Sequence, residues 1–160
     1  MDKLSDPRWQ SALAHSRYLA NLLATQPALI PELAAVWTAP LTAEQLAAGL
    51  TPAATDDDAI KAQLRRLRQL TMAHIALRDL CGLAPLAEVV ESMTLLADAT
   101  TNFALDHYHR LLAATYGEPL DKAGRPQRLL IIGMGKLGGR ELNVSSDVDY
   151  IFVYPEEGDT

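Results

Sequence analysis

The stretch Arg128–Tyr154, with the sequence RLLIIGMGKLGGRELNVSSDVDYIFVY, decides the fold of this chain. An apolar run at 129–132 leads into a segment with four glycines, and the sequence SSDVD at 145–149 then opens a second apolar run at 150–154. Both runs are short, rich in β-branched, aromatic or aliphatic residues and bounded by Gly or Pro, which favours strands over helices. The sequence therefore predicts two short strands that pair with each other.

Two carboxylates, those of Asp147 and Asp149, stand at the start of the second run. Because side chains alternate across a strand, residues two apart project to the same face, so we expect these carboxylates to converge. Adjacent carboxylates repel each other unless a cation lies between them, and Mg²⁺ is a divalent ion that prefers such oxygen ligands. The pair is therefore a predicted magnesium site.

The glycine pair Gly138 and Gly139 leaves the backbone bare between the two runs. A phosphate can approach such backbone N–H groups closely, particularly where a helix begins at that point. A glycine loop followed by paired aspartates predicts metal-assisted chemistry on a nucleotide phosphate.

Three other interpretations compete for this stretch. The sequence GMGKLG at 133–138 matches the dinucleotide-binding pattern G-x-G-x-x-G, but the next strand begins too early for a βαβ unit. Lys136 suggests a phosphate-binding P-loop, but it precedes Gly138, whereas the P-loop Lys follows the last glycine. A tight glycine turn before solvated aspartates would need no ligand.

The sequence GMGKLGGRELNVSSDVD at 133–149 resembles the nucleotidyltransferase motif of the bacterial bifunctional glutamine synthetase adenylyltransferase/adenylyl-removing enzymes. The part at 141–147 is similar to the first, N-terminal copy of the catalytic domain, which removes AMP in this family. The second copy usually carries a Gly-Tyr-Gly-Ser-Asp type of sequence there.

This resemblance implies a role for each site residue. Gly138 and Gly139 correspond to the glycines that hold the nucleotide phosphates, Ser146 shapes the same loop, and Asp147 and Asp149 correspond to the metal-binding aspartates. The implied cofactors are Mg²⁺ and an adenine nucleotide, ATP or ADP. The implied partners are glutamine synthetase and a PII-type nitrogen regulatory protein.

The resemblance also implies that the chain is a piece of a longer enzyme, in which phosphate attacks the AMP–tyrosine bond of glutamine synthetase and releases ADP. The family's third carboxylate lies on a later strand, beyond Thr160, so we expect little or no activity from this chain alone. The alternatives are a helical interaction module that docks glutamine synthetase or a regulator, and a nicotinamide-dependent oxidoreductase.

The amino-acid composition limits which classes of protein this chain can belong to. The chain has 160 residues, is 49% hydrophobic and carries a net charge of −6 with a pI near 5.1. An acidic globular chain of this kind argues against a nucleic-acid partner. Its apolar runs are too short to span a bilayer and its start shows no signal-peptide pattern, so we expect no membrane association and a cytoplasmic location.

The remainder of the sequence predicts helices and therefore a mainly α fold with a small β portion (α+β). We expect a first helix that starts at Asp6 and Pro7 and ends before Pro27, and a short helix opened by a capping box of Thr42 and Gln45.

Two long helices follow in the sequence. The acidic run at 55–58 is expected to cap a helix that reaches Leu80, with Gly82 just past its end. Pro85 opens the longest helix, which should stop at Gly117. Antiparallel packing of these helices gives a helical bundle, followed by the first strands of an incomplete nucleotidyltransferase sheet. The predicted domains are a helical region at 1–117, a linker at 118–127 and the start of a truncated nucleotidyltransferase domain at 128–160.

Four polar residues of the first long helix need a separate interpretation. His74 is expected inside the protein or at its edge, with a hydrogen-bond partner. Arg65, Arg66 and Arg68 cluster, and such a cluster is by default a solvated face. A role near the acidic site is the alternative for these arginines.

Overall fold

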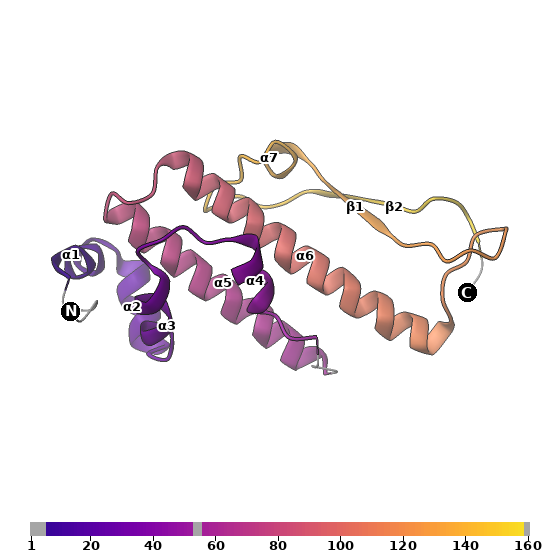
Figure 1. Ribbon diagram of the computed structural model, residues 1–160, viewed down its shortest axis with the longest axis horizontal. Helices are drawn as coiled ribbons and strands as arrows, with labels where there is room; N and C mark the ends of the chain where they lie inside the picture. Colours follow the sequence, from indigo (N-terminus) through magenta and orange to yellow (C-terminus); the bar gives the residue numbers. More distant parts are fainter. Residues whose placement is uncertain (1–5, 53–55, 159–160) are drawn as a thin grey trace.

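A computed structural model describes residues 6–52 and 56–158 of the chain. These residues form an elongated, mainly helical molecule with a two-stranded antiparallel sheet, which confirms the expected fold class (Figure 1). In chain order the elements are α1 (Pro7–His15), α2 (Arg17–Thr25), α3 (Leu29–Val36), α4 (Ala43–Ala48), α5 (Asp57–Leu80), α6 (Leu86–Tyr116), β1 (Leu130–Gly133), α7 (Gly135–Gly138) and β2 (Tyr150–Val153).

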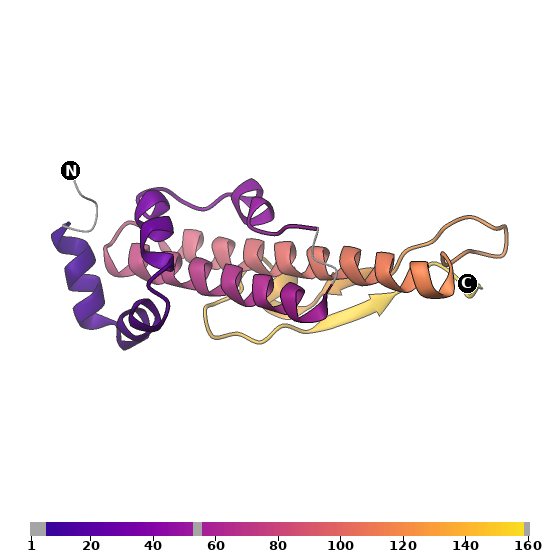
Figure 2. The same cartoon turned by 90° about the horizontal axis from the view of Figure 1, so that it is seen from below.

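The hairpin of α5 and α6 is the scaffold of the molecule, and both views show the two helices side by side (Figures 1 and 2). Asp56 caps α5 by accepting hydrogen bonds from the N–H groups of Asp58 and Ala59, so the acidic run acts as the predicted cap; Thr55 lies outside the described residues. Gly82 then turns the chain with a φ of +68°, a left-handed conformation that favours glycine. The predicted ends of both long helices are confirmed.

The expected first helix is wrong in one respect, because it is two helices that meet at Ser16. Ser16 has an extended backbone, with a φ of −118° and a ψ of 101°, and its side chain accepts from the N–H of Leu19 as the N-cap of α2. A serine side chain that bonds the backbone competes with helix continuation. The capping box of Thr42 and Gln45 is present at the start of α4, as predicted.

The short N-terminal helices pack on one end of the hairpin around a hydrophobic cluster that includes Trp9, Leu33, Trp37 and Leu77. Arg78, which is 3% exposed, donates to both carboxylate oxygens of Glu88 at 2.6 and 2.9 Å and to the carbonyl oxygen of Trp37 at 3.1 Å. One buried guanidinium therefore ties α5 to α6 and to the N-terminal helices.

The strands β1 and β2 form a ribbon that runs along α6 (Figure 1). They pair antiparallel, with Leu130 opposite Val153 and Gly133 opposite Tyr150, which confirms the predicted pairing. A dinucleotide-binding βαβ unit requires parallel strands, so the ribbon excludes that interpretation.

The ribbon is anchored near the glycine turn and the start of β2, and much of the rest of it is exposed. The hydroxyl groups of Tyr150 and Thr101 share a hydrogen bond of 2.6 Å, and Leu137 and Leu142 join a hydrophobic cluster with residues of α5 and α6. In contrast, large apolar side chains of both strands, such as Phe152, are exposed.

None of the described helices is long and apolar enough to cross a bilayer.

Candidate functional site

The glycine segment folds into a one-turn helix, α7, directly after β1. This helix begins at Gly135, so the pair Gly138 and Gly139 lies at its end and not at its start. The N–H of Gly138 donates to the carbonyl of Met134 at 3.3 Å, and that of Gly139 to the carbonyl of Gly135 at 3.0 Å. The backbone donors of the pair are therefore used within the turn itself.

The two glycines differ in how closely other backbone approaches them. A Cβ added at Gly138 would lie 2.6 Å from the carbonyl oxygen of Gly133 on β1, which no side chain tolerates. The nearest such atom at Gly139 is 3.5 Å away, an ordinary contact. Close packing of the turn on β1 thus explains the glycine at 138 without a ligand, but it does not explain the glycine at 139.

The two aspartates lie in the loop that leads from α7 to β2. This strand begins at Tyr150, so Asp147 and Asp149 precede it, and both are exposed. The N–H of Met134 donates to the carbonyl of Asp149 at 2.9 Å, which extends the ribbon by one bond. The hydroxyl of Ser146 donates to the side-chain oxygen of Asn143 at 2.6 Å and so stabilises a turn just before Asp147.

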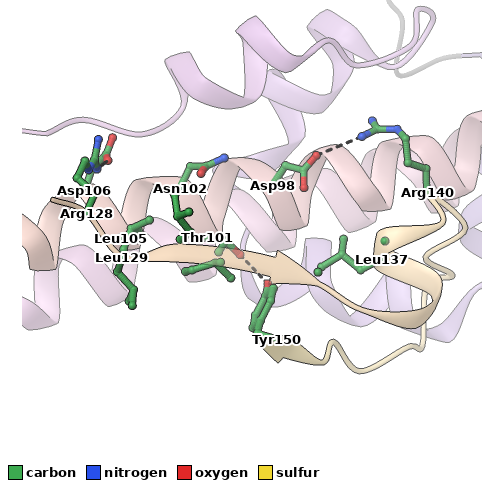
Figure 3. Close-up of a pocket in the computed structure, with 14 residues that line it drawn as sticks. Asp98, Thr101, Asn102, Leu105, Asp106, Arg128, Leu129, Leu137, Arg140 and Tyr150 are labelled. Atoms are coloured by element: carbon green, nitrogen blue, oxygen red, sulfur yellow. Dashed lines mark hydrogen bonds and ion pairs between the residues drawn. The ribbon is translucent and has the colours of Figure 1, made fainter. Parts of the chain in front are cut away.

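A first cavity, of about 550 Å³, lies between α6 and β1 (Figure 3). Gly133 and Gly138 line it beside polar side chains of α6. Its charged groups are already paired, since Arg140 bonds to Asp98 at 3.5 Å and Arg128 bonds to Asp106. The hydrogen bond to Glu91 raises the pKa of Arg140 above its usual value, so this guanidinium stays charged.

A second cavity, of about 380 Å³, lies between α5, α6 and the loop before β2. Ser146 and Asp147 line it from the loop, and Arg65 and Arg68 line it from α5. Both arginines are exposed, as expected for a solvated face, and their position beside Asp147 agrees with the alternative of a place near the acidic site. Their spacing of three residues was the available signal, because residues three apart share one face of a helix.

The predicted site residues are therefore divided between two places. Gly138 lines the first cavity, Ser146 and Asp147 line the second, and neither cavity includes Gly139 or Asp149. Tyr150 lines both cavities.

The residues present fit a magnesium ion in their donor chemistry. Mg²⁺ is typically held by one or two carboxylates and completes its shell with water and substrate phosphates. Asp147 and Asp149 offer such exposed carboxylates. Across residues 6–52 and 56–158, no group of three or more His, Cys, Asp or Glu side chains is placed to hold a metal.

These features describe an α+β protein in which a glycine turn and an aspartate-bearing loop are held against a helical hairpin. The chain belongs to the glutamate-ammonia ligase adenylyltransferase family, whose family model matches residues 8–160. It is similar to proteins named bifunctional glutamine synthetase adenylyltransferase/adenylyl-removing enzyme. The identity is 47% over 149 residues for the protein of Aromatoleum aromaticum, 46% over 156 for that of Nitrosomonas europaea and 44% over 168 for that of Thioalkalivibrio sulfidiphilus.

These alignments cover 93%, 94% and 99% of the chain but only 16%, 17% and 17% of the three relatives. The chain thus spans about a sixth of their length.

Proposed function

We propose that this chain is part of the adenylyl-removing half of a glutamine synthetase adenylyltransferase/adenylyl-removing enzyme. The names of the relatives support the enzyme class, and the similarity of 141–147 to the family's first catalytic copy supports the adenylyl-removing half. The observation that carries the proposal is that Ser146 and Asp147 of this motif line a cavity in the size range of ligand sites.

The proposed reaction is a phosphorolysis that depends on Mg²⁺. Inorganic phosphate attacks the phosphorus of the AMP–tyrosine bond in adenylylated glutamine synthetase, and the products are ADP and the free tyrosine hydroxyl. In this proposal the enzyme works in the cytoplasm and responds to a PII-type nitrogen regulatory protein.

The residues of this chain have distinct roles in the proposal. Asp147 and Asp149 hold Mg²⁺, which when bound polarises the phosphoryl group and offsets negative charge on its oxygens. Ser146 fixes the loop through Asn143. Gly138 lets the turn pack closely on β1, which helps to position the loop that carries these aspartates. Because the family's third carboxylate is not among these residues, the isolated chain is expected to bind metal and nucleotide weakly and to release little or no ADP.

The test is the release of ADP from adenylylated glutamine synthetase by a protein of the relatives' full length that carries these residues. Release should require phosphate and Mg²⁺, and it should be lost in Asp147→Asn with Asp149→Asn. A matched control, Asp58→Asn with Asp79→Asn, removes two exposed carboxylates of α5 and should keep the activity.

Undiminished release by the Asp147 and Asp149 variant would exclude these carboxylates from the chemistry. Capture of glutamine synthetase that is insensitive to both substitutions would then support the alternative, a helical docking module.

A further inference from the structure

Arg65 and Arg68 lie one turn apart on α5, and both line the cavity that Ser146 and Asp147 reach from the loop. Both side chains are exposed, and neither pairs with a carboxylate of residues 6–52 or 56–158. Arg66, between them, points elsewhere and forms an ion pair with Glu32 of α3. The cluster is thus split into one structural arginine and two with free donors.

Within residues 6–52 and 56–158, Arg17 and Arg110 also form no ion pair, but of the arginines without one only Arg65 and Arg68 line this cavity. Each of five others forms an ion pair with a carboxylate: Arg8, Arg78, Arg125, Arg128 and Arg140. A guanidinium presents five N–H donors in a planar fork, and two of these donors match two oxygens of a phosphate. Two guanidinium groups that line one cavity and form no ion pair therefore favour a phosphate group as their ligand.

The rest of the cavity wall is largely apolar and favours a ligand larger than phosphate itself. The apolar lining residues come from the helices and from the loop, and they include Leu64, Met93, Leu96, Leu142 and Val148. Its volume of about 380 Å³ lies in the range of small-molecule sites, where apolar walls accompany a few polar anchors. A nucleotide combines these chemistries, since its base is largely apolar on its faces and its phosphate is anionic.

We propose that Arg65 and Arg68 bind a phosphate group of an adenine nucleotide in this cavity, beside Asp147. This inference rests on the proposed function, because it names residues that hold the nucleotide of that reaction. Inorganic phosphate has the same anionic chemistry, so the test must separate the two sources.

The test is an NMR titration of the 160-residue chain with AMP, ADP or inorganic phosphate, each without and with Mg²⁺. Chemical-shift changes report weak binding as well as tight binding, so the method suits this chain. The variant is Arg65→Gln with Arg68→Gln. The control, Arg66→Gln with Arg110→Gln, removes the same charge from side chains that do not line this cavity. Far-UV circular dichroism checks that each variant keeps its helices.

The expected result is that the Arg65 and Arg68 variant weakens AMP and ADP binding about tenfold or more, which corresponds to the loss of one charge-assisted contact or more. The control should change the dissociation constants by less than about twofold, and the side-chain Nε–H signals of Arg65 and Arg68 should shift when AMP is added.

Three results would overturn the inference. These are an absence of AMP and ADP binding to the unmodified chain, equal weakening in both variants, and loss of phosphate binding with AMP binding intact. The last result would assign the arginines to inorganic phosphate instead. The titration needs no turnover, so it can succeed when the ADP-release assay fails, and it can fail when that assay succeeds.

Discussion

The pair of Arg78 and Glu88 is expected to be a principal stabilising contact of the helical region, and Glu88→Gln tests it. The side chains of Arg78 and Glu88 are 4% and 17% exposed, so the substitution leaves a guanidinium buried without its counter-charge. Removing one partner of a buried ion pair costs roughly 3–5 kcal/mol. Because Glu88 keeps some contact with solvent, we expect the lower end, about 3 kcal/mol. For a chain of this length that corresponds to a fall in melting temperature of roughly 6–12 °C.

The assay is urea unfolding of the 160-residue chain, followed by far-UV circular dichroism. Glu91→Gln is the matched control, because Glu91 lies one turn further along α6 and also pairs with an arginine, Arg140, but its side chain is 45% exposed. Exposed ion pairs add little to stability, so this variant should unfold close to the unmodified chain. Equal and small losses of unfolding free energy in the two variants would refute the argument from burial.

Two further outcomes are expected. Burial lowers the pKa of His74 below 6.5, and its Nε2–H donates to the carbonyl of Ala39 at 3.0 Å. As the pH falls, the unfolded chain therefore binds a proton before the folded chain does, and the free energy of unfolding should drop from pH 6.5 towards the lowered pKa. The substitution His74→Gln should flatten this drop relative to the unmodified chain. Parallel pH profiles of the two proteins would contradict this expectation. Gly138→Ala should disrupt the turn on β1, lower the free energy of unfolding by about 1–3 kcal/mol and speed up amide exchange in β1. Gly139→Ala should leave amide exchange in β1 unchanged. Equal exchange rates in the two variants would exclude the backbone clash at Gly138.

The helical part of the fold follows from local chemistry, and the sequence predicts it well. The ends of α5 and α6 are set by residues that act on their own neighbours, such as the Asp56 cap and the left-handed Gly82. Pro85 and Gly117 bound α6 in the same way. His74 also lies where its sequence position predicts, buried and bonded to a carbonyl.

The break at Ser16 was not predictable in this way. The hydrophobic spacing of α1 and α2 is continuous across it, and serine is neither a strong helix former nor a reliable helix breaker. The break lets Trp9 and Ala12 of α1 and Leu19 and Leu23 of α2 reach one cluster around α5. Tertiary packing, which the local sequence does not encode, therefore acts together with the Ser16 cap at this boundary.

The candidate site shows the same division between local and tertiary information. The paired strands, the glycine turn and the position of the aspartates near the second strand follow from 128–154 alone. Gly138 and Asp147 line different cavities, and both cavities are lined by Tyr150, whose hydroxyl group shares a hydrogen bond with Thr101 of α6. A contact across 49 residues has no signature in either segment.

The helical region and the ribbon are therefore better understood as one physical unit than as a scaffold with an appended motif. Leu137 and Leu142, which flank the glycine turn, are buried in a cluster with Met72 of α5 and Met93 of α6. The same two helices supply the arginines and part of the apolar wall of the cavity that Asp147 lines. The arginines come before the predicted linker at 118–127 in the sequence, and Asp147 comes after it. A shift of the ribbon along α6 would therefore also move Asp147 relative to the arginines. In the proposed function, the helices would thus set the geometry of phosphate binding, and the hydrogen bond between Tyr150 and Thr101 is one contact that fixes it.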